Sequence, residues 1–186
     1  MRLYRAWLVF CLAGLLAACA TPHRITDAGG AQAFERTGRF AVSVMRDNGK
    51  QQAVQGGFAW RDDGQTLRLD LANPLGNTLA RVQVSPGYSV LTRSDGSQEQ
   101  ASDPDGLVEQ VLGSAIPVEG LRDWLRGRTG AVLNLEKNQA GQVTGFQQNG
   151  WRVALSRYDS LGPRLLQLNR NDSNQRISVR LVVDGT

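Results

Sequence analysis

The sequence predicts a mainly β fold with some α structure, an antiparallel sheet of about eleven strands that two short helices interrupt once. Three observations predict it. Apolar and polar residues alternate with period two in many short segments, turn residues separate these segments, and two helix patterns stand together in mid-chain. Because each strand has one apolar and one polar face, we expect an antiparallel sheet with one face toward water.

The alternation is clearest in five segments, which define the strand positions. Phe40, Val42 and Val44 alternate with polar or small residues, and the same period recurs at 67–71, 80–84, 151–155 and 177–181. Short turns rich in Gly, Asn and Asp separate successive segments, which is typical of hairpins in a meander. The predicted strands are 37–46, 51–62, 66–72, 77–84, 88–93, 97–101, 131–138, 142–148, 151–158, 164–169 and 175–183.

Two short helices are predicted between the sixth and seventh strands. Asp103 is a favourable N-cap and Pro104 fits the first helical position, with Gly113 as the stop. The second helix runs from Glu119 to Gly127. Both have an apolar face, formed by Leu107, Val108, Val111 and Leu112 in the first and by Leu121, Trp124 and Leu125 in the second. We therefore expect the helices to cap the concave face of the sheet.

The space between the helices and the sheet has two interpretations. A sheet of eleven strands has to curl, close or split into layers, and helices across its concave face then enclose an apolar space. That space is either an ordinary packed core or a cavity. The period-two pattern does not distinguish them.

Residues 1–18 have the features of a secretory signal peptide. Arg2 and Arg5 form a positive n-region, and an uncharged run of thirteen residues follows from Ala6 to Ala18. Signal h-regions are about 7–15 residues long, whereas a membrane span needs roughly 20. We therefore expect this segment to be cleaved, which leaves 168 residues, enough for one ordinary domain.

Cys19 follows Leu16-Ala17-Ala18, and this stretch resembles a bacterial lipobox. A lipobox cysteine is diacylated, becomes the new N-terminus and is acylated again, and two or more acyl chains give stable anchoring. An ordinary signal-peptide end with a free cysteine nearby is the alternative. Ala20 follows Cys19. An Asp at this position would resemble an inner-membrane retention signal, so Ala favours sorting to the outer membrane.

The organisation after the cleavage point is a tether followed by one domain. Residues 19–35 contain Pro22, Gly29 and Gly30 and show no periodicity, so we expect a lipidated N-terminus and tether there. A short helix over 27–35 is a further expectation. Residues 36–186 then form a single domain.

Composition excludes several classes of protein. Removal of the leader lowers the net charge from +4 to +2, because Arg2 and Arg5 leave with it; this is too little and too dispersed for nucleic-acid binding. Cys19 is the only cysteine after cleavage and His23 the only histidine. An intramolecular disulfide, a Cys/His zinc site and a Ser-His-Asp triad therefore lack their usual residues. We expect no metal, no cofactor and no nucleic-acid partner.

Several short motifs occur in a fixed order along the chain. They are Gly38-Arg39-Phe40-Ala41-Val42, Gly57-Phe58-Ala59-Trp60, Leu71-Ala72-Asn73-Pro74-Leu75-Gly76-Asn77-Thr78, Gly113-Ser114-Ala115-Ile116-Pro117-Val118 with Trp124-Leu125, and Gln148-Asn149-Gly150-Trp151 with Tyr158. Each motif alone is weak, but the ordered series, with the lipobox, extends from residue 16 to about 181. In this series the chain resembles the LolB family, the outer-membrane receptors of the lipoprotein-localisation (Lol) pathway.

The resemblance implies an unclosed antiparallel β-barrel whose short helices cap a hydrophobic cavity. The cavity takes the acyl chains of cargo lipoproteins, which the periplasmic carrier LolA delivers, and the receptor inserts them into the inner leaflet of the outer membrane. We expect a monomer, not an enzyme, anchored through Cys19 on the periplasmic side of the outer membrane of a Gram-negative bacterium. No nucleotide is used, and neither Lys50 nor Lys137 stands in a Walker A motif.

The expected site has two parts, and the first is the acyl-chain cavity. Its candidate lining residues are Phe40, Val42, Phe58, Trp60, Leu67, Leu69, Leu71, Leu121, Trp124 and Leu125, on the inward strand faces and the second helix. We expect Trp60 and Trp124 at the cavity mouth, because large amphipathic rings tolerate both lipid and water. An ordinary core position is the alternative for each residue singly.

The second part is a membrane-insertion loop made of Pro74, Leu75 and Gly76. The β-turn at 73–76 puts Leu75 at a hairpin tip, where Gly, Asn, Asp and Ser are the usual residues. Leu75 either folds back against Leu71 or Leu79, or protrudes and dips into outer-membrane lipid, which the resemblance favours.

Two other functions compete with a lipoprotein receptor. A membrane-tethered hydrolase would use carboxylate pairs such as Asp62-Asp63 or Asp103 with Asp105, but these stand at turn and cap positions where backbone hydrogen bonding explains them. A lipid-anchored assembly scaffold would have a filled core and would bind no lipid.

Overall fold

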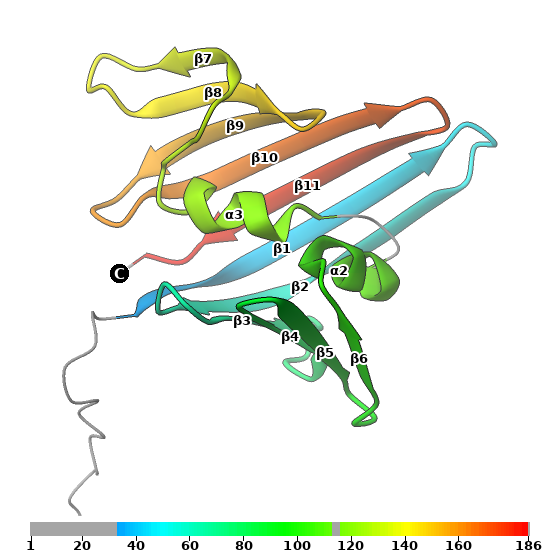
Figure 1. Ribbon diagram of the computed structural model, residues 1–186. Coiled ribbons are helices and arrows are strands. Elements are labelled where there is room, and N and C mark those ends of the chain that lie inside the picture. Colours follow the sequence, from blue (N-terminus) through cyan, green and yellow to red (C-terminus); the bar gives the residue numbers. More distant parts are fainter. Residues whose placement is uncertain (1–32, 113–115, 186) are drawn as a thin grey trace, which may run out of the picture. The chain divides into compact units, whose positions relative to one another are not determined.

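The computed structural model describes residues 33–112 and 116–185, and they form one antiparallel sheet of eleven strands (Figure 1). The strand order is β6-β5-β4-β3-β2-β1-β11-β10-β9-β8-β7, so the sheet is not closed and ends at β6 and β7. Every predicted strand is found, with ends within three residues of those expected. The strands are β1 (Phe34–Arg46), β2 (Gln51–Asp62), β3 (Leu67–Ala72), β4 (Thr78–Ser85), β5 (Tyr88–Arg93), β6 (Gln98–Ala101), β7 (Leu133–Lys137), β8 (Val143–Gln148), β9 (Trp151–Tyr158), β10 (Pro163–Asp172) and β11 (Gln175–Val183).

The sheet consists of two meanders that the first and last strands join. β1 pairs antiparallel with β11, with Val42 opposite Val179 at the centre of the ladder. Between the meanders the chain leaves edge strand β6, forms α2 (Pro104–Leu112) and α3 (Val118–Trp124), and enters the opposite edge strand β7. Figure 1 shows both helices in front of the sheet, between its two free edges. The segment that joins the edges therefore covers the concave face, as predicted.

Some expectations lie wholly or partly outside the described residues. The signal peptide, Cys19, most of the tether and Gly113 are among them. The short helix expected over 27–35 is wrong where it can be compared, because Phe34 and Glu35 are the first residues of β1. There they lie opposite Asp62 and Arg61 of β2, and cross-strand pairing outweighs a weak local helical tendency. In residues 33–112 and 116–185, no helix has the length and hydrophobicity needed to cross a membrane.

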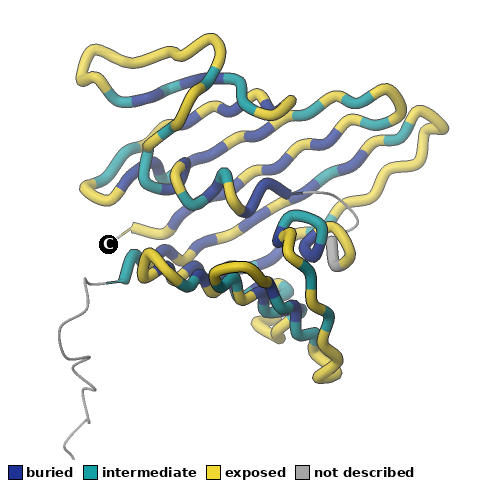
Figure 2. The backbone as a smooth tube through the Cα atoms, in the orientation of Figure 1, coloured by how far each residue is buried: buried dark blue, intermediate teal, exposed yellow. Residues whose placement is uncertain are grey.

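The period-two pattern becomes an alternation of buried and exposed residues along the strands (Figure 2). Phe40, Val42 and Val44 of β1 are at most 4% exposed. They belong to one hydrophobic core that the inner face of the sheet shares with α2 and α3. The polar face of the sheet is thus its outer face.

Two glycines explain the aromatic motifs of β1 and β2. Phe40 lies opposite Gly56, and Phe58 lies opposite Gly38. A Cβ atom on Gly56 would be 3.2 Å from the Phe40 ring, and one on Gly38 would be 2.9 Å from the Phe58 ring. Both Cβ atoms would also meet neighbouring carbonyl oxygens within 2.2 Å. Each ring therefore occupies the space that a side chain on the opposite strand would need.

Candidate functional site

An apolar cavity lies between the inner face of the sheet and the two helices. Seven predicted residues line it: Phe40, Phe58, Trp60, Leu69, Leu71, Leu121 and Leu125. Val108 of α2, Ile116 and Leu181 of β11 complete the lining, so every lining residue is apolar. The cavity volume is about 30 Å³, which corresponds to about two water molecules. In this conformation the space is nearly filled by side chains.

Three predicted lining residues are buried without lining this cavity. Val42 and Leu67 are 3% and 0% exposed and belong to the surrounding core. Trp124 is 2% exposed, and its ring packs edge-on against Phe146 at a centroid distance of 5.4 Å. Period two identifies the inward face correctly, but it does not say which inward residues border an empty space.

Three lining residues were not predicted as such, although the sequence carried a signal for two of them. Val108 is on the predicted apolar face of the first helix, and Leu181 is in the alternation of the last strand. Ile116 stands in the connection between the helices, where neither helical nor strand periodicity applies. Its burial depends on the position of α2 over the sheet.

Trp60 and Trp124 were both expected at the cavity mouth, but their surroundings differ. Trp60 is 2% exposed, and its indole Nε1 has no hydrogen-bond partner among the described residues. A buried N–H without a partner is unfavourable. The Trp124 Nε1 instead donates to Gln148 Oε1 at 3.0 Å. Trp124 also borders a polar groove of about 280 Å³ with Asp105, Glu119 and Arg170, so of the two only Trp124 lies between apolar and polar surroundings.

Asp62 fixes α3 to the end of β2. Its carboxylate is 3% exposed and accepts hydrogen bonds from Arg122 at 2.7 Å and from Arg126 at 2.8 Å. Burial opposes ionisation of Asp62, but the hydrogen bonds from Arg122, Arg126 and the Gly64 N–H outweigh it and lower the pKa to about 2. The carboxylate is therefore ionised at neutral pH.

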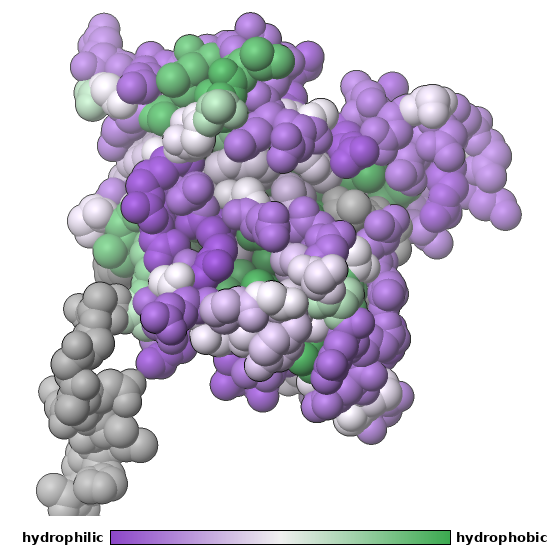
Figure 3. Space-filling view, in the orientation of Figure 1, coloured by the Kyte–Doolittle hydropathy of each residue, from purple (hydrophilic) through white to green (hydrophobic). Residues whose placement is uncertain are grey.

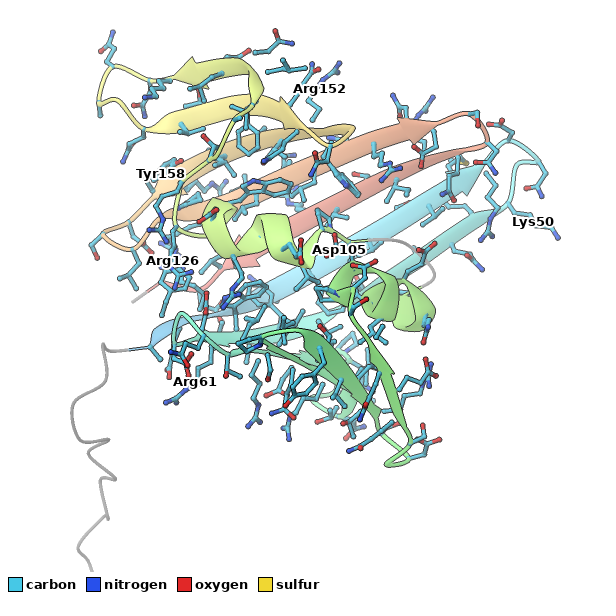
Figure 4. The ribbon with its side chains drawn as sticks, viewed as in Figure 1. Lys50, Arg61, Asp105, Arg126, Arg152 and Tyr158 are labelled. Atoms are coloured by element: carbon cyan, nitrogen blue, oxygen red, sulfur yellow. The ribbon has the colours of Figure 1, made fainter. Side chains whose placement is uncertain are left out.

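A second ion pair closes the same end of the sheet. Arg36, on the inner face of β1, donates to both carboxylate oxygens of Asp159 in the β9–β10 turn, at 3.0 and 2.9 Å. The Arg36 side chain is 1% exposed. The Arg126 guanidinium lies 4.0 Å from the centroid of the Phe34 ring (Figure 4). The ionic end of the site therefore consists of Asp62, Arg122, Arg126, Arg36 and Asp159.

Asp105 connects the two helices. Pro117 precedes α3 and provides no side-chain cap. The Asp105 carboxylate of α2 accepts hydrogen bonds from the N–H groups of Val118 at 2.7 Å and Glu119 at 3.3 Å instead. Figure 4 shows Asp105 between the helices. Burial raises the pKa of Asp105, against the lowering effect of these two bonds.

The carboxylates that a hydrolase would use all have structural roles. Asp63 accepts hydrogen bonds from the N–H groups of Gln65 and Thr66 in its turn. Asp103 caps α2 as predicted, by accepting from the N–H groups of Asp105 and Gly106. Asp62 and Asp105 hold α3. In the described part of the chain, no group of three or more His, Cys, Asp or Glu side chains could hold a metal ion.

Leu75 protrudes from the β3–β4 turn. Its side chain is 85% exposed, so it does not fold back against Leu71 or Leu79. Asn73 Oδ1 accepts hydrogen bonds from the N–H groups of Leu75 and Asn77, at 2.9 and 3.0 Å, and Gly76 takes a positive φ of 87°. The turn is thus fixed by its own hydrogen bonds and does not depend on the leucine side chain.

Comparison with known proteins identifies the family. The family model described as "Outer membrane lipoprotein LolB" matches residues 32–185. The protein "Outer-membrane lipoprotein LolB" of Bordetella pertussis is 51% identical over 98% of this chain and 94% of its own length. The proteins of the same name from Bordetella petrii and Cupriavidus necator are 50% and 39% identical, over 96% and 95% of this chain and 92% and 94% of their own lengths.

Among solved structures, the LolA superfamily protein NE2245 from Nitrosomonas europaea aligns with a TM-score of 0.45 at 8% identity, over 83% of this chain and 88% of its own. The relatives match nearly the whole chain and are named as outer-membrane lipoproteins. They support a role in lipoprotein localisation at the outer membrane of a Gram-negative bacterium. The chain belongs to the LolB family of outer-membrane lipoproteins.

Proposed function

We propose that this protein accepts the acyl chains of lipoproteins from the periplasmic carrier LolA and inserts the lipoproteins into the inner leaflet of the outer membrane. The chains enter the space between the sheet and the two helices. One observation carries the proposal: the lining of that space is entirely apolar and lies between the free edges of an open sheet. The protein itself is anchored to the same membrane through acylated Cys19.

The energetics of acyl chains in water explain why such a receptor is needed. Three chains of roughly fifteen methylenes each, at ~0.8 kcal/mol per CH₂, give on the order of 35 kcal/mol for exposure to water. Free diffusion of a lipoprotein across the periplasm is therefore negligible. The cargo passes from one apolar site to another and then to the bilayer, and transfer without nucleotide runs toward the more favourable apolar environment.

Acceptance of acyl chains requires α2 and the apolar side of α3 to move away from the sheet around the cavity, while Arg122 and Arg126 keep the ionic end on Asp62 of β2. A cavity of about 30 Å³ holds no acyl chain. The helices contact the sheet mainly through apolar side chains, and such burial is non-directional, so lipid chains replace these contacts without leaving polar groups unpaired. The directional bonds of α3 to Asp62 and Asp105 lie outside the cavity lining.

Leu75 assists release in this proposal. The protruding side chain inserts into the bilayer surface, so that cargo leaves the cavity without crossing water. One buried leucine contributes about 1.5–3 kcal/mol, enough to favour transient contact but too little to anchor the protein.

A transfer assay tests the function. LolA loaded with a labelled lipoprotein is mixed with the full-length protein in vesicles, and the label is located after separation of soluble carrier from vesicles. We expect transfer to vesicles that contain the protein and little transfer to vesicles that lack it. Equal transfer with and without the protein would exclude the proposal.

The nearly filled space is the observation that favours the second candidate, an assembly scaffold without lipid binding. An apolar fluorescent probe distinguishes the two. A receptor binds the probe stoichiometrically and releases it when fatty acid is added, whereas a scaffold with a packed core leaves the probe in solution. A variant with a secretable start in place of the leader and Cys19 extends the test, because it separates anchoring from acceptance.

A further inference from the structure

Ion pairing divides the basic side chains into two groups. Each arginine between Arg61 and Arg128 forms a salt bridge with a carboxylate. The basic residues that form none within 33–112 and 116–185 are Arg39, Arg46, Lys50, Lys137, Arg152, Arg157, Arg164, Arg176 and Arg180. They belong to β1, the β1–β2 turn and β7–β11. Positive charge without a partner is therefore concentrated on one half of the sheet.

Four of these arginines lie together on the outer face of the sheet. Arg39, Arg152, Arg176 and Arg180 are exposed, and the residues that follow them along their strands, Phe40, Val153, Ile177 and Leu181, are buried on the inner face. Arg180 lies opposite Ala41, two residues from Arg39. Arg152 lies opposite Asn169, which lies opposite Ser178, midway between Arg176 and Arg180. Since strands are about 4.8 Å apart, Arg152 is about 10 Å from β11. We call these four residues the basic face.

The residues that lie between the four arginines of the basic face have short or uncharged side chains. The outward residues between the arginines are Ala41, Ser43, Ala154, Gln167, Asn169 and Ser178. Of the nearby carboxylates, Glu35 pairs with Arg61 and Asp172 with Arg170. Asp184, opposite Thr37 at the Arg39 end of the face, forms no salt bridge among the described residues and accepts a hydrogen bond from Thr37 at 3.2 Å, so it offsets part of the positive charge there.

A groove of about 580 Å³ lies at the β7 side of this face and is lined by Leu133, Arg152 and Asn169 among others. Arg39, Arg176 and Arg180 are not part of its lining, so three of the four charges are spread over the open face, an arrangement that fits an extended negatively charged surface.

We propose that the basic face lies on anionic phospholipid headgroups of the membrane that holds the lipid anchor. A juxtamembrane arginine contributes about fivefold to the affinity for such a surface. Fifteen residues separate Cys19 from Phe34, which limits the reach of the tether to ~50 Å, and Arg39 follows five residues after Phe34. The tether thus keeps the domain within reach of the membrane, and the charges of the basic face decide which side meets the lipid.

Two exposed leucines border the basic face and agree with this orientation. Ala72, the last residue before the Leu75 turn, lies opposite Gly57, which lies opposite Arg39. On the other side, Leu133 of β7 is 71% exposed and lies opposite Gln147, itself opposite Arg152. Figure 3, viewed from the side of α2 and α3, shows that the hydrophobic surface over β7 is also exposed on that side. With the basic face on lipid, α2 and α3 point into the periplasm, where a soluble carrier arrives.

The proposal rests on the proposed function only for the acylation of Cys19, and orientation is measured without cargo. The mature lipoprotein is reconstituted in vesicles of phosphatidylethanolamine and phosphatidylglycerol. A fluorophore is attached to Ser178→Cys on the basic face or, as the control site, to Glu119→Cys on α3. Lipids with a nitroxide on the headgroup then quench a fluorophore that lies at the membrane surface. We expect strong quenching at Ser178→Cys and weak quenching at Glu119→Cys.

Charge variants and salt test the cause of the orientation. Substitution of Arg39, Arg152, Arg176 and Arg180 by Gln is expected to reduce quenching at position 178 to that at position 119. A charge-matched variant with Gln at Arg46, Lys50, Lys137 and Arg157 keeps the wild-type quenching. The wild-type protein should show strong quenching at position 178 in low salt. It should lose this quenching in 1 M salt, where the Debye length is about 3 Å.

Three outcomes would overturn the proposal. They are equal quenching at the two sites, unchanged quenching in vesicles of phosphatidylcholine alone, and equal loss in both charge variants. Failure of the cargo transfer assay with preserved quenching at Ser178→Cys would refute the proposed function but leave this orientation standing.

Discussion

Two regions hold α3 against the sheet, and they use different kinds of interaction. One is the apolar middle of the contact, and the other is its ionic end. In the middle, Leu121 and Leu125 pack against Phe58 and Leu69 around a small apolar cavity. At the ionic end, Arg122 and Arg126 donate to the buried Asp62 carboxylate. Hydrophobic burial has no preferred direction, whereas charge-assisted hydrogen bonds fix a geometry. The middle is therefore suited to exchange of contacts, and the ionic end to keeping α3 in register.

The largest effect is expected for a charge in the apolar middle. Leu69 is 6% exposed and lines the cavity, so Leu69→Asp buries a carboxylate without a partner, at a cost of several kcal/mol. Denaturant unfolding and probe binding measure the result. A protein that unfolds supports a packed core, and a folded protein that no longer binds probe supports a lipid cavity.

Gln83→Asp, on the exposed face of the neighbouring strand, is the control for Leu69→Asp. It should retain both fold and probe binding. Retention of both in Leu69→Asp as well would show that the inner face does not have the role inferred for it.

The ionic end is expected to give the next largest effect. Asp62→Asn removes a carboxylate that two arginines share, and we expect the free energy of unfolding to fall by about 2–3 kcal/mol. Because the pKa of Asp62 is lowered to about 2 from its usual 3.8, its stabilising contribution is complete above about pH 4. It is lost as the pH falls from there toward 2.

Urea unfolding of wild type and Asp62→Asn between pH 2 and 6 checks this window. The difference between them should be constant above about pH 4 and shrink toward zero below it. Asp47→Asn, in the exposed β1–β2 turn, is the control and should unfold like wild type. A difference that stays constant down to pH 2 would contradict the assigned role of the Asp62 charge.

A smaller difference in stability is expected between variants of Trp60 and Trp124. Trp60→Phe removes an N–H that has no partner, while Trp124→Phe removes a hydrogen bond to Gln148. Both lose the same atoms, but only Trp124→Phe also loses a hydrogen bond. We expect Trp124→Phe to be the less stable variant by about 1 kcal/mol. Thermal unfolding measures it, and equal stability would mean that the Gln148 bond contributes nothing net.

The smallest effect on stability is expected at Leu75, outside both regions. Leu75→Glu changes a side chain that is 85% exposed, so unfolding should change by less than about 0.5 kcal/mol. Release of cargo into vesicles should slow about tenfold or more, because the lost leucine contact is worth about 1.5–3 kcal/mol. Tyr88→Glu, at the exposed first residue of β5, is the control. Release at the wild-type rate from Leu75→Glu would refute membrane insertion by this loop.

Local sequence signals predicted most of the secondary structure. The eleven strands follow from period two and from turns in which Gly49, Gly76 and Gly141 take positive φ, and α2 begins at Pro104 as its cap predicts. The short helix expected over 27–35 is wrong at residues 34–35 because the structure there is not determined locally. Their conformation depends on β2, which lies more than fifteen residues away, and no local pattern records that pairing.

The candidate site was predicted only in part, because some of its features depend on local sequence and others on tertiary packing. Seven of the predicted lining residues border the cavity, because the inward face of a strand is a local property. The volume of the cavity and the exclusion of Val42, Leu67 and Trp124 from its lining depend on how closely α2 and α3 approach the sheet. This approach is set by side chains from distant elements.

By itself, the sequence determined the strands, the two helices, the polar outer face and the protruding turn at Leu75, since each depends on residues within a few positions of one another. The tertiary structure alone decided the β1–β11 pairing, the Arg36–Asp159 pair across 123 residues and the capping of α3 by Asp105. It also decided that Asp62, which looked like a turn residue, holds Arg122 of α3 and Arg126 just beyond the end of that helix. The physical reason is that ion pairs and helix packing depend on distance in space, and folding brings together groups whose separation along the chain carries no periodic signal.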